Sequence, residues 1–327
     1  MSLQNTIIVV NEEPYCIWEV DLKNRNIEFI ESIDVDYFEY LLNIHANSED
    51  EKRASVALKS ALHHAVETFF SLLGAYIQAS DCAYAWVAKC SNKDLRLLIA
   101  KIIEGNRGTY TSLNLDEVSF DSVACLIFKC YMPDSEKGDL TKKLFSKFWH
   151  RMGQEFLEEK NIDEYNSLKH GFRVKSGGFS LAIGKQAEKG VRASVDEMTS
   201  LGGSQYGASY FKLETVGETK NNRSLRSRKV SLNWSVEKVA LQLQLICMSI
   251  TNIVSALKII NDVDASECKF VRPIEDGDFD KPWSYSTGVT SCSMDFVIDG
   301  SRVVSVTKNE LIEALKEQLE NTNRKSG

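Results

Sequence analysis

Several features that would place a protein in a known class are missing from this sequence. It has only four prolines in 327 residues and no repetitive or Pro/Ser-rich stretch, so no low-complexity linker divides it. Cys and His never cluster at ligand spacing and no CxxC pair occurs, which argues against a zinc site. The P-loop, nucleophile-elbow, HExxH and dinucleotide-binding signatures are also absent. We therefore predict neither a metal nor a cofactor.

The sequence also lacks the features of a secreted or membrane-spanning chain. The N-terminus has no basic region followed by an apolar run. Residues 239–257 carry no charge, but six of these 19 residues are polar and would be stranded in lipid. We predict a long buried helix with a polar seam here, no membrane partner, and a cytoplasmic protein. Its eight scattered cysteines are then expected to be reduced and mostly buried.

Charge is segregated along the chain. The net charge of −7 argues against bulk electrostatic binding to nucleic acid. However, residues 165–192 contain six Lys and Arg against one acid, and residues 220–229 contain five and no acid. Together these two segments carry +10, so the rest of the chain carries −17.

Hydrophobic periodicity predicts an α+β fold, mainly helical, with small β elements at the N-terminus, after residue 171 and near the C-terminus. Three segments are expected: a β-hairpin and short helix (1–48), a helical core (49–171), and a β-rich insertion with a long helix and a C-terminal αβ segment (172–327). Predicted helices cover 34–44, 49–79, 82–90, 93–104, 115–131, 139–160, 162–170, 232–261 and 307–320. Predicted strands cover 5–22 and 27–30 around a turn at 23–26, then 172–174, 179–183, 206–216, 268–272, 292–298 and 302–306.

The most informative motif is at residues 165–173. Asn166 and His170 stand one helical turn apart and so share a face, and Gly171 ends the helix. His170 could act as an acid or base with Asn166 as orienter, while Lys169 and Arg173 would hold a phosphate. Alternatively, Asn166 and His170 simply cap the end of a helix.

The motif and its helical context resemble the HEPN superfamily over residues 50–171. These are compact helical domains, common in bacterial toxin and defence systems, and some are dimeric, metal-independent ribonucleases. Their motif is Arg, a polar residue, three variable residues and His, which Asn166 and His170 match. Tyr165 stands in place of the Arg that would stabilise phosphodiester cleavage. The resemblance thus implies a binding or regulatory homodimer whose ligand is RNA, a nucleotide or a protein, and only secondarily a phosphodiesterase using His170. A structural protein without a small-molecule site is the third hypothesis.

Two further groups of residues leave alternatives open. His63 and Glu67 are i,i+4 partners that could ligate a metal or form an acid–base pair, or be an ordinary semi-buried pair, with His64 as a hydrogen-bonded core residue. The basic stretch 220–229 either contacts phosphates or forms a solvated hairpin tip. Its candidate binding residues are Arg223, Arg226 and Arg228.

Overall fold

The computed structural model describes residues 3–129, 135–170, 173–186, 188–191, 193–216, 222–294 and 306–325. It forms two compact units. Unit 1 comprises Met1–Lys169 and Trp234–Ser286, and unit 2 comprises His170–Asn233 and Thr287–Gly327. The predicted segment 172–327 is thereby divided, because its long helix belongs to unit 1. The α+β, mainly helical fold class is confirmed.

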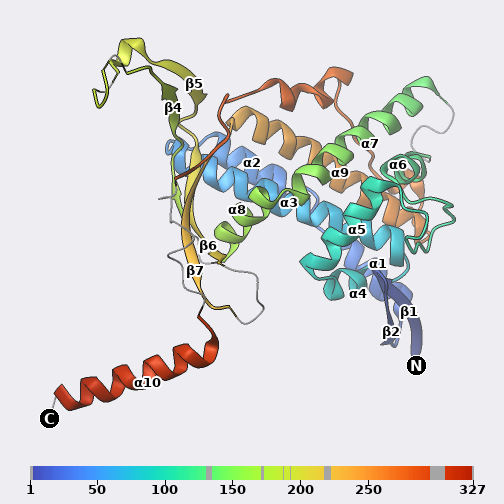
Figure 1. Ribbon diagram of the computed structural model, residues 1–327. Helices are drawn as coiled ribbons and strands as arrows, with labels where there is room; N and C mark the ends of the chain where they lie inside the picture. Colours follow the sequence, from blue (N-terminus) through green and yellow to red (C-terminus); the bar gives the residue numbers. More distant parts are fainter. Residues whose placement is uncertain are drawn as a thin grey trace. The chain divides into compact units, whose positions relative to one another are not determined.

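Unit 1 is a helical body with one hairpin, and its two longest helices lie side by side (Figure 1). These are α3 (Glu51–Ala79) and α9 (Val236–Ile260). The other elements are β1 (Gln4–Val10), β2 (Glu13–Glu19), α1 (Leu22–Glu31), α2 (Tyr37–Ala46), α4 (Ala83–Lys89), α5 (Asn92–Glu104), α6 (Phe120–Phe128), α7 (Glu136–Leu157) and α8 (Glu159–Lys169).

The α3 seam read from the sequence is confirmed. Apolar residues at alternating steps of four and three fall on one helical face. Every one of them is at most 5% exposed: Leu58, Leu62, Ala65, Phe69, Leu72 and Tyr76. Burying a large apolar side chain contributes about 1.5–3 kcal/mol, so this face alone stabilises the unit substantially.

Helix α9 is buried and has the polar seam that its sequence predicts. Ser249 accepts a hydrogen bond from Trp149 Nε1 at 2.9 Å, and the Asn252 side chain bonds both the N–H and the C=O of Val271 at 2.8 Å. By length and composition α9 could cross a membrane, and 67% of its most apolar stretch is buried within the protein. Residues 268–272 were predicted to form a strand. The backbone N–H and C=O of Val271 instead bond the Asn252 side chain, and these residues form no strand, so that prediction is wrong.

The N-terminal hairpin is present, but its turn and second strand are not where we predicted. The turn is Asn11–Glu12, with Asn11 at φ +57°, a left-handed conformation that Asn tolerates. Residues 23–30 lie in helix α1 because Asp21 caps it, accepting from Asn24 N at 3.3 Å. Asn26 then reaches the core, where it accepts from Ala83 N at 2.7 Å and donates to Ser80 O at 3.0 Å.

Unit 2 is built on a four-stranded antiparallel sheet in the order β3-β6-β7-β8. Its strands are β3 (Val174–Ser176), β6 (Gly207–Thr215), β7 (Leu225–Asn233) and β8 (Ser291–Met294). A separate ribbon pairs β4 (Ser180–Ile183) with β5 (Thr199–Gly203), and α10 is Lys308–Lys325. Figure 1 shows β6 and β7 as the longest strands of the sheet. Sequence reasoning missed β7, while the strand predicted at 302–306 falls largely outside the described residues.

Candidate functional site

The predicted motif straddles the boundary between the two units. Asn166 is half-buried on α8, whereas His170 is exposed and begins unit 2. Neither side chain makes a hydrogen bond within the part of the chain that the structure describes. Gly171, which we expected to end the helix, lies outside that part. A catalytic role for Asn166 and His170 therefore stays a prediction.

The two basic residues of the motif differ in their surroundings. Lys169 Nζ lies 3.2 Å from Glu67 Oε1 and 5.2 Å from the centre of the Tyr165 ring, so its charge is largely satisfied inside unit 1. Burial and the Glu67 carboxylate raise the pKa of Tyr165. Arg173 is exposed at the start of unit 2.

The histidine that sequence reasoning paired with Glu67 has a different partner. His63 Nε2 lies 2.9 Å from Oε2 of Glu164 on α8, and Lys59 Nζ lies 3.7 Å from the same oxygen. Glu164 is only 1% exposed, and the side chains of His63 and Lys59 are 13% exposed. The Tyr165 ring stacks on His63 with centroids 5.3 Å apart. Lys59 and His63 are four residues apart, so the sequence predicts that they are neighbours on one face of α3. Glu164 is 101 residues from His63 in the sequence, so no local pattern predicts their contact.

Burial and charge set the protonation of this cluster. Burial lowers the pKa of His63, the Lys59 charge lowers it further, and the Glu164 carboxylate offsets these effects only in part. Burial raises the pKa of Glu164, but Lys59 and His63 together outweigh burial and leave that pKa below its usual value. At neutral pH the imidazole of His63 is thus neutral, and it shares one oxygen of the ionised Glu164 carboxylate with Lys59. His64, expected in the core, is exposed and meets the Phe38 ring edge-on.

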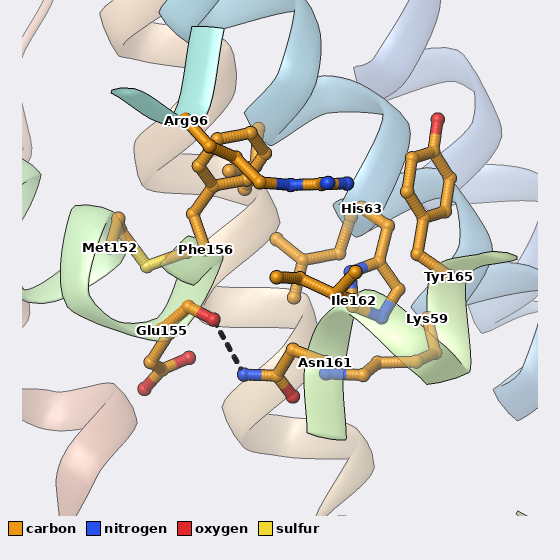
Figure 2. Close-up of a pocket in the computed structure, with 11 residues that line it drawn as sticks. Lys59, His63, Arg96, Met152, Glu155, Phe156, Asn161, Ile162 and Tyr165 are labelled. Atoms are coloured by element: carbon orange, nitrogen blue, oxygen red, sulfur yellow. Dashed lines mark hydrogen bonds between the residues drawn. The ribbon is translucent and has the colours of Figure 1, made fainter. Parts of the chain in front are cut away.

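A small cavity opens beside this cluster (Figure 2). It offers about 30 Å³ to the centres of water-sized molecules, enough for about two of them. Figure 2 shows Arg96 of α5 and Lys59 of α3 reaching into one space with His63. Its wall contains Lys59, Leu62, His63, Val66, Arg96, Met152, Glu155, Phe156, Asn161, Ile162 and Tyr165.

Glu155 is the only carboxylate in the cavity wall as described, and it is held by other partners. Its carboxylate lies 3.0 Å from Lys238 Nζ and accepts from Gln242 at 2.9 Å and from Trp283 Nε1 at 3.0 Å. The backbone oxygen of Glu155 accepts from Asn161 Nδ2 at 2.7 Å, as drawn in Figure 2. Burial raises the pKa of Glu155, yet Lys238, Lys59 and Gln242 outweigh burial and lower it overall. Glu155 is therefore an anion whose charge is compensated by Lys238.

In unit 2, one face of the sheet is open. Side chains on β6 and β7 alternate between exposed and half-buried, as two antiparallel strands with one free face should. The exposed set includes large apolar residues, namely Phe211 (68% exposed), Leu213 (65%) and Leu225 (57%). Phe211 stands directly opposite Lys229 on β7. Lys175 of β3 stands opposite Ser209, two residues from Phe211 on the same face, and is also exposed, so each strand beside β6 carries an exposed lysine near Phe211.

Arg226 and Arg228 lie in strand β7 and not in a solvated hairpin tip, which was one of the two alternatives for this stretch. Both face away from the open face, and their guanidinium groups lie 2.8 and 3.3 Å from the Glu214 carboxylate. The hydrogen bond from Arg226 is the main reason that the pKa of Glu214 is lowered. Arg223 is exposed, and its backbone N–H donates to Val306 O at 2.9 Å. Lys220, the other end of this basic stretch, lies outside the described residues.

The segregation of charge along the sequence coincides with the division into units. Unit 2 contains 16 Lys and Arg against 11 Asp and Glu, a net charge of +5. Since the whole chain carries −7, unit 1 carries −12. The open face thus belongs to the basic unit of an acidic protein.

The cysteines are less buried than the sequence predicts. All seven cysteines in the described ranges are free thiols, but only Cys82 and Cys247 are buried, so the expectation of mostly buried thiols is wrong. Among the described residues no three His, Cys, Asp or Glu side chains gather as metal ligands would.

Comparison with known proteins identifies no relative. No protein-family model, no curated protein and no solved structure matches the chain. The resemblance to the HEPN superfamily consequently remains a prediction.

Proposed function

We propose that the protein is an RNA-binding module that holds a single strand on the open face of β6 and β7. The observation that carries this proposal is the exposed Phe211, with Lys229 and Lys175 on the same face of the two neighbouring strands, in a unit of net charge +5. Unpaired bases stack on exposed aromatic rings, and lysines beside them contact the phosphates.

The composition of the face favours a single strand over a duplex. Its central aromatic ring offers a stacking surface, which a base-paired helix cannot use because its bases are already stacked. Hydroxyls on the same face supply further hydrogen bonds to bases or sugars: Ser209 and Ser231 stand opposite each other with their oxygens 2.8 Å apart. The apolar Leu213 and Leu225 extend the platform.

The arginines predicted as phosphate ligands have a smaller part in this proposal. Arg226 and Arg228 share the Glu214 carboxylate on the other face, so their charges are partly neutralised and point away from the platform. Lys175 and Lys229 replace them as the phosphate-contacting residues, with exposed Arg173 and Arg223 adding to the positive field.

Fluorescence anisotropy with a labelled single-stranded RNA of about 12 nucleotides tests the proposal. Stacking contributes about 1–3 kcal/mol per base, so Phe211→Ser should weaken binding by roughly 5- to 150-fold. Ile183→Ser is the matched control, because Ile183 is a similarly exposed apolar residue on β4. It should bind as the wild type does.

Two comparisons separate RNA binding from binding of a protein partner. Phe211→Leu keeps an apolar side chain but loses the ring, so it should bind RNA nearly as weakly as Phe211→Ser. Duplex RNA should bind more weakly than the single strand. Wild-type protein that binds no RNA at about 50 mM salt, or a Phe211→Ser variant that binds as tightly as Ile183→Ser, refutes the proposal.

A further inference from the structure

The cavity in unit 1 contains one basic side chain whose charge no neighbour offsets. Arg96 lines the cavity, its Nε is buried without a hydrogen-bond partner, and no described carboxylate forms an ion pair with it. The other charges are compensated: Lys59 lies near Glu164, and Lys238 lies near Glu155. Taken together, these five groups carry a surplus of one positive charge, located on Arg96.

A surplus guanidinium in a half-buried cavity is costly unless something compensates it. Arg96 is half-buried, and taking its Nε out of water is unfavourable because no described atom accepts the hydrogen bond of that Nε. Glu164 does not compensate the charge of Arg96. Oε2 of Glu164 contacts His63 and Lys59, and Oε1 of Glu164 is buried without a hydrogen-bond partner among the described residues. The cavity therefore favours an occupant that accepts hydrogen bonds and carries negative charge.

We propose that this cavity binds a small oxyanion, a phosphate or carboxylate group, through Arg96, with Lys59 and His63 beside it. The planar guanidinium matches two oxygens of such a group. The cavity admits about two water-sized molecules, which matches the two oxygens that such a group would present to Arg96, and the apolar walls formed by Ile162, Val66 and Phe156 leave the anion few other partners. This site lies wholly within unit 1 and is independent of the RNA-binding proposal.

Titration calorimetry of the full-length protein with inorganic phosphate and, separately, with acetate tests the site. Wild-type protein should bind at least one of them in a saturable way that chloride at equal ionic strength does not reproduce. Arg96→Gln should lose at least tenfold in affinity. Arg107→Gln is the matched control, because Arg107 belongs to the same unit but its side chain is 86% exposed. It should bind as the wild type does, and preference for phosphate or for acetate identifies the anion.

Thermal unfolding without added anion distinguishes a binding residue from a structural one. If Arg96 is an uncompensated cation, Arg96→Gln should melt at the same temperature as the wild type or higher. Arg96→Lys keeps the charge without the planar group and should bind with intermediate affinity. The proposal is overturned if neither anion binds, if Arg96→Gln binds like Arg107→Gln, or if Arg96→Gln melts lower in anion-free buffer.

Discussion

Acidification should destabilise unit 1 through His63. Burial and Lys59 lower the pKa of this imidazole in the folded protein, whereas in the unfolded chain it returns to about 6.5. Below that pH the unfolded state binds a proton that folded His63 does not, so stability is lost as pH falls. Between pH 7.0 and 5.5 the loss from this residue amounts to as much as about 1.2 kcal/mol in the free energy of unfolding.

Glu164 does not contribute to the change in stability between pH 7.0 and 5.5. Its folded pKa is lowered, so its contribution to stability is fully present above its unfolded value of about 4.5 and disappears only at lower pH. The measurement between pH 7.0 and 5.5 therefore isolates histidine from the carboxylate that it contacts.

Urea unfolding followed by tryptophan fluorescence reports on unit 1, because all five tryptophans belong to it. His63→Gln keeps a donor for Glu164 but cannot titrate, so its stability should fall less than that of the wild type over this range, by up to about 1.2 kcal/mol. His64→Gln should remove a smaller part of the loss than His63→Gln does, because burial also lowers the pKa of His64 but its side chain is more exposed than that of His63. Equal pH dependence in His63→Gln and wild type refutes the reasoning.

Two further substitutions test the packing of unit 1 by the same urea assay. Gly74→Ala should cost about 1–3 kcal/mol, because a Cβ there would stand 2.3 Å from the Trp86 ring, while Gly277→Ala, which meets nothing within 4 Å, should change stability by less than about 0.5 kcal/mol. A neutral Gly74→Ala would show that the α3–α4 contact is loosely packed. Asn26→Ala should cost roughly 1–3 kcal/mol, since it leaves the buried N–H of Ala83 without an acceptor, and a loss no larger than that of the exposed Asn47→Ala would contradict this.

Local pattern predicted the fold class and the longest helices. The α3 seam and the polar seam of α9 follow from periodicity within one element, which the sequence displays directly. Residues 23–30 were mistaken for a turn and a strand, because short polar segments fit either state. The Asp21 N-cap and the buried hydrogen bonds of Asn26 stabilise the helix over the predicted turn and strand. Strand β7 was not predicted, because a segment with alternating Lys and Arg residues resembles a solvated loop. Only its pairing with β6 shows that it is a strand.

The two surfaces at the centre of our proposals required the tertiary structure. Arg96 carries no motif, and its unpaired charge appears only when the neighbours from α3, α7 and α8 are in place. Likewise, Phe211 and Lys229 are 18 residues apart and become neighbours through strand register. Of the three arginines predicted from the basic stretch 220–229, Arg226 and Arg228 face away from the open face, which only the pairing of β7 with β6 makes apparent.

The most direct test of the RNA-binding proposal is ultraviolet crosslinking of the full-length protein to single-stranded RNA, followed by mass spectrometry of the joined peptides. Our account predicts crosslinks concentrated on β6 and β7 around Phe211, lost in Phe211→Ser and retained in Ile183→Ser. Crosslinks confined to unit 1, or none under conditions where the RNA is bound, would contradict it.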